Sequence, residues 1–172
     1  HAEMDHSGGL PEVLRRLGGR ELVASTNGVK ALQAHFHWQQ PVRAVKDGES
    51  ISLGQSKLHF VEARMLHWPD SMFSYLDSDR VLFSNDAFGM HLASSERFAD
   101  EIDPWILENE AAKYYANIIL PLSPMVQKLL ERLPSLGLDI GTIAPDHGPV
   151  WRRDPMKIVG RYAEWAAQKP GK

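Results

Sequence analysis

The sequence predicts an α/β protein with α+β character, built as a layered αββα sandwich. Short segments with β-type composition are separated by helical segments, and both show the expected hydrophobic periodicity. Candidate metal ligands fall in loops or at predicted strand ends. Because strand ends are rigid positions that suit a binding site, these ligands are expected to converge at one edge of the sandwich.

Composition narrows the class of protein. The chain has 172 residues, of which 43% are hydrophobic and 24% charged, with a net charge of −3. These values are ordinary for one soluble domain. Without a block of Lys or Arg, no nucleic-acid partner is expected. The chain has no cysteine, which excludes disulfides and metal–thiolate sites in this segment and fits a cytoplasmic protein. No apolar run is long enough to span a membrane.

Helical and strand signals alternate along the chain. The first third has a helix over residues 11–17, a strand over 21–26, a helix capped by Asn27, and strands over 42–45 and 56–62. The remainder has a hairpin of strands followed by helices, a last strand and a terminal helix. These segments cover residues 72–76 and 80–84, 104–120 and 123–133, 140–144, and the stretch that begins at Asp154.

Potential metal ligands are the most informative residues of the chain. Four of them lie within the first six residues and three lie far away in sequence: His1, Glu3, Asp5 and His6, then His67, Asp86 and His147. On an extended loop, alternation would put His1, Glu3 and Asp5 on one side, with His6 brought in as the chain turns. Nitrogen and oxygen donors without sulfur suit zinc, iron or manganese. Asp86 could bridge two ions about 3.5–4 Å apart, so a dinuclear site is predicted.

These ligands and four further segments carry a resemblance to one family. The motif His1-x-Glu3-x-Asp5-His6, with its three distant partners, resembles the metallo-β-lactamase-like domain of flavodiiron proteins. Those are oxygen and nitric oxide reductases, also called A-type flavoproteins or rubredoxin:oxygen oxidoreductases. The supporting segments are residues 65–71, 83–89, 114–118 and 145–148. The resemblance covers essentially the whole chain.

The resemblance implies how the ligands are shared between two iron ions. One iron would be held by His1, Glu3 and His67. The other would be held by Asp5, His6 and His147, with Asp86 bridging the two. In some members of that family the histidine that matches His6 is displaced by water.

The resemblance also implies residues around the irons. Tyr114 and His91 would lie near the substrate pocket as hydrogen-bond or proton donors. Trp68, beside a ligand, would help to shape the pocket or contact the flavin, so Trp68 and Glu3 are the expected cofactor-binding residues. Asp146 is a plausible hydrogen-bond partner for a ligating histidine, because such ligands commonly need one.

Three other histidines, His35, His37 and His59, are expected to be structural. Most isolated histidines in folded proteins are core or surface residues. Nothing in their spacing connects them with the predicted metal ligands.

The resemblance implies a larger protein. Residues 1–168 would be the C-terminal part of the metallo-β-lactamase-like domain, so the sandwich is expected to be incomplete at its N-terminal side. Residues 169–172 would begin a linker to a flavodoxin-like FMN domain. A head-to-tail homodimer would bring the FMN of one subunit to the diiron centre of the other, with rubredoxin or a similar protein as electron donor.

The predicted function is reduction of O2 to water, of NO to N2O, or of both, with electrons delivered through FMN. The alternative is a dinuclear zinc hydrolase of the same fold, such as a thioesterase or lactonase. Glu3 favours the redox enzyme, because related hydrolases usually carry His-x-His-x-Asp-His, and zinc has no accessible redox change. A non-catalytic interaction module is a third possibility, against which the intact ligand set argues.

Overall fold

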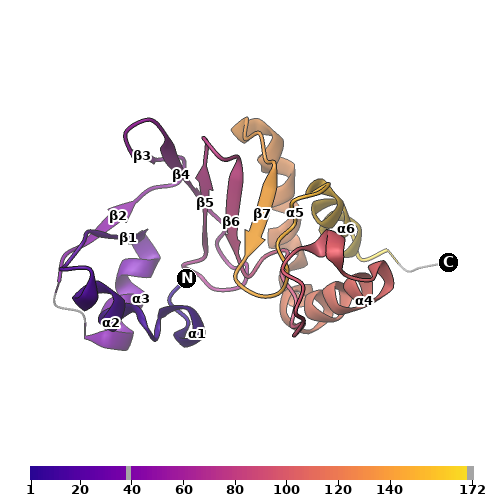
Figure 1. The fold of residues 1–172 in the computed structure, drawn as a ribbon, viewed down its shortest axis with the longest axis horizontal. Helices are drawn as coiled ribbons and strands as arrows, with labels where there is room; N and C mark the ends of the chain where they lie inside the picture. Colours follow the sequence, from indigo (N-terminus) through magenta and orange to yellow (C-terminus); the bar gives the residue numbers. More distant parts are fainter. Residues whose placement is uncertain (38–39, 170–172) are drawn as a thin grey trace.

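The molecule consists of a small lobe beside a larger layer of sheet and helices (Figure 1). The computed structural model describes residues 1–37 and 40–169. The small lobe contains α1 to α3 and the strands β1 and β2, whereas α4, α5 and α6 lie on the opposite side of the larger sheet. The N-terminus lies between the two parts, next to one end of β5.

The small lobe follows the predicted order closely. Its elements are α1 (Met4–Ser7), α2 (Leu10–Arg16), β1 (Leu22–Ser25), α3 (Thr26–Phe36) and β2 (Val42–Val45). The predicted helix and strands are confirmed to within one residue at each end. The strands β1 and β2 form a parallel pair, and α3 connects them in a short β–α–β arrangement.

The predicted cap of α3 is wrong. The N-cap is Ser25, whose backbone is extended (φ −61°, ψ 161°) and whose hydroxyl accepts a 3.0 Å hydrogen bond from the N–H of Gly28. Asn27 lies inside the first turn instead, and its amide donates to the carbonyl of Pro69 at 3.1 Å. A hydroxyl that ends the preceding strand meets the helix donors directly, which is the geometry that an N-cap requires.

The predicted extended conformation of the first loop is also wrong in part. Glu3 precedes the helix with φ −59° and ψ 147°, but Met4–Ser7 form one helical turn, in which the N–H of Ser7 donates to the carbonyl of Glu3 at 2.9 Å. A helix rotates by about 100° per residue, so Asp5 and His6 point in directions different from that of Glu3. Because of this turn, the ligands of one short loop point in different directions, Glu3 in one and Asp5 and His6 in others.

The larger sheet has five strands in the order β3-β4-β5-β6-β7. They are β3 (Ser50–Ser52), β4 (Lys57–Glu62), β5 (Met72–Leu76), β6 (Val81–Asn85) and β7 (Thr142–Pro145). The predicted hairpin is confirmed as β5 and β6. Strand β3 was not predicted, because three residues with one apolar side chain show no periodicity.

Strand directions bring the predicted ligand positions to one edge of this sheet. All neighbouring strands are antiparallel except β6 and β7, which run parallel. The start of β5 and the ends of β6 and β7 therefore lie at the same edge. The loop that carries His67 precedes β5, while Asp86 and His147 follow β6 and β7.

Helices cover one face of this sheet. They are α4 (Pro104–Tyr114), α5 (Ser123–Arg132) and α6 (Met156–Ala166), with short 3₁₀ turns at Ala99–Glu101, Leu120–Leu122 and Leu133–Leu136. The predicted helix over 104–120 ends early as an α-helix and continues as a π-helix, Tyr115–Ile119. Pro121 has no N–H and its ring would clash with the carbonyl four residues earlier, so a regular helix cannot continue through it.

The core lies between the five-stranded sheet and the helices. Phe73, Leu82 and Ile143 of the sheet are fully buried with Ile158 and Tyr162 of α6. Full burial of each such aliphatic or aromatic side chain contributes about 1.5–3 kcal/mol. Strands β5, β6 and β7 are thus held firmly, and they fix the positions from which the ligand side chains project.

Within residues 1–37 and 40–169, no helix is both long enough and apolar enough to cross a membrane. The predicted linker over residues 169–172 lies outside the described residues, apart from Lys169.

Candidate metal centre

The structure brings all seven predicted ligands together at the edge of the sheet. They divide into two sets around the carboxylate of Asp86, which is 1% exposed. The Glu3 half of the site comprises His1, Glu3 and His67. The Asp5 half comprises Asp5, His6 and His147.

In the Glu3 half, donor atoms gather around one oxygen of Asp86. The Nε2 atoms of His1 and His67 each lie 3.2 Å from Oδ2 of Asp86. The same two nitrogens lie 3.0 and 3.3 Å from Oε2 of Glu3. All four ligand atoms therefore face one small volume.

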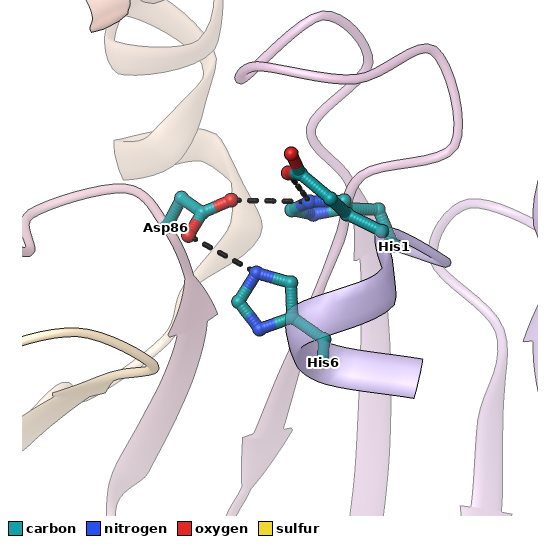
Figure 2. Close-up of side chains that lie close together, drawn as sticks. His1, His6 and Asp86 are labelled. Atoms are coloured by element: carbon teal, nitrogen blue, oxygen red, sulfur yellow. Dashed lines mark hydrogen bonds and ion pairs between the residues drawn. The ribbon is translucent and has the colours of Figure 1, made fainter. Parts of the chain in front are cut away.

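In the Asp5 half, donor atoms gather around the other oxygen of Asp86. The Nε2 atom of His147 lies 3.2 Å from Oδ1 of Asp86 and 3.2 Å from Oδ2 of Asp5. The Nε2 atom of His6 lies 3.3 Å from Oδ1 of Asp86 and 3.6 Å from Oδ1 of Asp5. Figure 2 shows the carboxylate of Asp86 between His1 and His6, with one oxygen directed at each ring.

The unsatisfied atoms fit a pair of metal ions. Within the part of the chain that the structure describes, both oxygens of Asp86 and Nε2 of His6 are buried without a hydrogen-bond partner. Buried polar atoms are normally paired, so orphans of this kind call for an ion or a comparable group. Ligand atoms about 2.1 Å from a shared ion lie about 3.3 Å apart, close to the separations within each half. Three carboxylates in one place also require positive charge to balance them.

A second layer of side chains connects the two halves. Nδ1 of His1 contacts Oδ1 of Asn85, and Nδ2 of Asn85 donates to Oδ2 of Asp146 at 2.6 Å. The same oxygen of Asp146 lies 3.2 Å from Nδ1 of His6. Asp146 thus partners a predicted histidine ligand, as the sequence analysis expected. Asn85 was missed as a partner of His1. Its backbone is left-handed (φ 57°), a conformation that asparagine adopts more readily than most residues, so an asparagine directly before a ligand is a usable sequence signal.

Comparisons with known proteins agree with this geometry. The family model of the ODP family beta lactamase matches residues 1–148. The chain is 44% identical over 167 residues to the nitric oxide reductase of Moorella thermoacetica, covering 96% of this chain and 42% of that protein. The solved structure of rubredoxin oxygen:oxidoreductase from Desulfovibrio gigas matches with a TM-score of 0.96 at 44% identity, covering 99% of this chain and 43% of that one.

A second solved structure names the family directly. The crystal structure of the flavodiiron protein from Giardia intestinalis matches with a TM-score of 0.92 at 32% identity, over 100% of this chain and 42% of that one. The chain belongs to the ODP beta-lactamase family. It is a metallo-β-lactamase-like domain of the flavodiiron type. The chain spans less than half the length of these relatives.

Tyr114 and His91 lie beside the predicted ligands. The ring centroids of His91 and Tyr114 are 4.8 Å apart, and those of His91 and His147 are 5.3 Å apart. Burial raises the pKa of the Tyr114 hydroxyl above its usual value, and the charge of the nearby Asp86 carboxylate raises it further. Tyr114 therefore keeps its proton next to the carboxylate shared by both halves.

Trp68 lies against two of the predicted ligands in the Glu3 half. Its ring stacks on that of His1 with 6.1 Å between centroids and 11° between planes, and it meets His67 edge-on at 6.3 Å. Its side chain is still 37% exposed. It thus offers an accessible aromatic surface in contact with the site.

The histidines expected to be structural differ in their surroundings. His59 lies on β4 and forms an ion-pair contact of 3.6 Å with Asp77, far from the metal ligands in the sheet. His35 contacts the ligand loop: its Nδ1 lies 2.9 Å from the carbonyl oxygen of Ala2. No local sequence pattern indicates that contact, because residue 35 is separated from residue 2 by two helices and a strand.

Proposed function

We propose that this domain is the diiron centre of an oxidoreductase that reduces O2 to two water molecules with four electrons and four protons, or two NO molecules to N2O and water with two electrons and two protons. The observation that carries the proposal is the buried carboxylate of Asp86, whose two oxygens each face a separate set of histidine and carboxylate ligands. The names of the relatives from Moorella thermoacetica and Desulfovibrio gigas support the same activity.

The proposed ligands are His1, Glu3 and His67 for one ion and Asp5, His6 and His147 for the other, with Asp86 shared. A pair of iron ions supplies reversible one-electron redox changes at two adjacent positions, which neither the side chains nor zinc can supply. The carboxylates of Glu3, Asp5 and Asp86 favour the more highly charged, oxidised ions, because their negative charges compensate it.

Tyr114 and His91 are the proposed donors towards the substrate. The hydroxyl of Tyr114 holds its proton beside Asp86, and the ring of His91 lies between Tyr114 and His147. A preorganised donor stabilises negative charge that develops on a bound oxygen atom more effectively than water does. Their role is to hold and donate protons, while the metal ligands remain in place.

Electrons are proposed to arrive through FMN in a flavodoxin-like domain, with a rubredoxin-type protein as donor and a head-to-tail homodimer as the working assembly. Trp68 supports the FMN proposal, because its exposed ring contacts two ligand histidines and offers a flat surface to an isoalloxazine. Solution scattering of the whole protein tests the assembly. A monomer with high turnover would contradict the dimer.

Metal analysis combined with turnover tests the proposed activity. The whole protein, loaded anaerobically with iron, is expected to bind two iron ions per chain and to consume NO anaerobically or O2 aerobically when its flavin is reduced. Two zinc ions per chain, with thioesterase or lactonase turnover and no gas consumption, would establish the hydrolase alternative instead. No bound metal after reconstitution would favour an interaction module.

A further inference from the structure

The two peptide groups that flank Ala2, between two proposed ligands, are each held by side chains from elsewhere in the chain. Ala2 lies between His1 and Glu3 and is 4% exposed. Its N–H donates a 2.8 Å hydrogen bond to Oδ2 of Asp70, which is 5% exposed. A carboxylate rarely becomes this buried unless a specific partner requires it.

The carbonyl of the same residue is held from two other elements. The hydroxyl of Ser7, in α1, lies 2.9 Å from the carbonyl oxygen of Ala2 and 2.9 Å from that of Glu3, so its one proton is shared between them. Nδ1 of His35, near the end of α3, lies 2.9 Å from the carbonyl oxygen of Ala2. A carbonyl oxygen only accepts, so this nitrogen of His35 carries the hydrogen.

Asp70 is itself hydrogen-bonded to the small lobe. Its backbone carbonyl accepts a 3.0 Å hydrogen bond from the hydroxyl of Ser25, which also caps α3. Asp70 further lies three residues after His67, a ligand in the same half as His1 and Glu3. The small lobe is thereby connected to the ligand loop through one carboxylate and one imidazole.

We propose that Asp70, Ser7 and His35 form a clamp on the two peptide groups that flank Ala2 and that Asp70 is a positioning residue for the Glu3 half of the centre. Asp70 holds the peptide group that joins His1 to Ala2, whereas Ser7 and His35 hold the one that joins Ala2 to Glu3. His1 and Glu3 lie at the outer ends of these two peptide groups, so fixing both planes fixes both side-chain origins. Outer-layer partners of metal ligands typically change metal affinity by about 10- to 100-fold. This inference rests on the dinuclear centre proposed above.

Iron release from the whole protein tests the clamp. In Asp70→Ala, iron bound by the Glu3 half is expected to leave to a chelator at least about 10-fold faster than in the wild type. Iron in the Asp5 half should respond less, and Mössbauer spectra of the iron-loaded protein can follow the two ions separately. Asp70→Asn should be intermediate, because its side-chain carbonyl can still accept from the N–H of Ala2.

Asp77→Ala is the matched control. Asp77 also accepts a 2.8 Å hydrogen bond from one backbone N–H, that of Lys57, but at the opposite end of the sheet. Its removal should lower Tm without accelerating iron release. If Asp70→Ala lowers Tm as Asp77→Ala does and releases iron at the wild-type rate, Asp70 is merely structural. Equal acceleration from both halves would also overturn the proposal.

Two further measurements keep the test decisive. Should Asp70→Ala fail to fold, Ser7→Ala and Asp70→Asn take its place, and unchanged iron release in both would overturn the clamp. Should wild-type protein bind metal yet reduce neither O2 nor NO, the proposed function fails while the release comparison still decides the clamp. Should it bind only zinc or cobalt, release of that metal is compared in the same way.

Discussion

The Glu3 half and the Asp5 half contain similar donor groups but are held by the fold in different ways. The ring of His1 is 0% exposed and is stacked on Trp68, and the two peptide groups after it are hydrogen-bonded to other side chains. Asp5, by contrast, is 50% exposed on a single helical turn. The Glu3 half thus contains a fully buried ring next to a hydrogen-bonded backbone, whereas the Asp5 half contains a half-exposed carboxylate.

This difference indicates that the two halves have different roles. A buried, hydrogen-bonded ligand keeps its geometry, while an exposed ligand leaves room for another group to approach. His91 adjoins His147, and His91 and Tyr114 line a pocket of about 190 Å³ together with Glu110, Lys113, Asn117 and Ile118. The following predictions test whether the halves behave independently.

Removing the shared carboxylate should have the largest effect. Asp86→Asn keeps the shape of the side chain but removes the charge and one of the two ligand oxygens. Because each oxygen faces one half, both halves should lose metal, and activity should fall more than the 100-fold that marks the upper range for outer-layer changes. Metal analysis and turnover measure this. Full retention of one ion would show that the halves do not depend on Asp86 equally.

Changes in the second layer should separate the halves. Asn85→Ala removes the partner of His1, and Asp146→Ala removes the partner of His6. Each should weaken one ion by about 10- to 100-fold. Because Asn85 also donates to Asp146, the double variant should be less than additive. Metal titration of both single variants and the double variant measures the coupling, and strict additivity would show that the halves are uncoupled.

Tyr114→Phe should change activity without changing metal content. The variant keeps the buried ring and loses only the hydroxyl beside Asp86. Loss of one donor to negative charge that develops on the substrate corresponds to a rate about 10- to 150-fold lower. Turnover is measured at equal iron loading. A parallel loss of iron would show that Tyr114 supports the ligands rather than the reaction.

The smallest effect is expected far from both halves. Asp103 caps α4 by accepting from the N–H groups of Trp105 and Ile106 at 2.9 and 3.2 Å. Asp103→Ala should cost about 1 kcal/mol, or roughly 3 °C in Tm. Metal affinity should be unchanged in either half, as measured by titration. A shift in affinity would mean that global stability, not local positioning, controls the site.

The local sequence predicted much of this architecture. Strands β2 and β5 agree with their predicted bounds, and β6 is displaced by one residue, because alternating apolar side chains and nearby turn residues are local signals. The ligand set was predicted from residue type and spacing together with the family resemblance. Pro121 is also a local signal, because a proline without an N–H indicates that the regular α-helix ends before it.

Other features could not be predicted from the sequence. The helical turn at Met4–Ser7 depends on contacts of Ser7 with the preceding carbonyls, which no four-residue pattern reveals. His35 was interpreted as structural because nothing in its neighbours points to Ala2. Asp70 lies within a segment that resembles the family, but only the fold shows that it is buried against a backbone N–H.

The sequence by itself determined which donor atoms are available, which elements carry them, and, through Glu3, that the site carries a carboxylate where the related hydrolases usually have a histidine. Only the tertiary structure decided which of these donors form the Glu3 half and which form the Asp5 half. Donor chemistry belongs to each side chain, whereas the division depends on strand direction, one helical turn and hydrogen bonds between residues distant in sequence. Those are products of packing, and they give the two halves their unequal support.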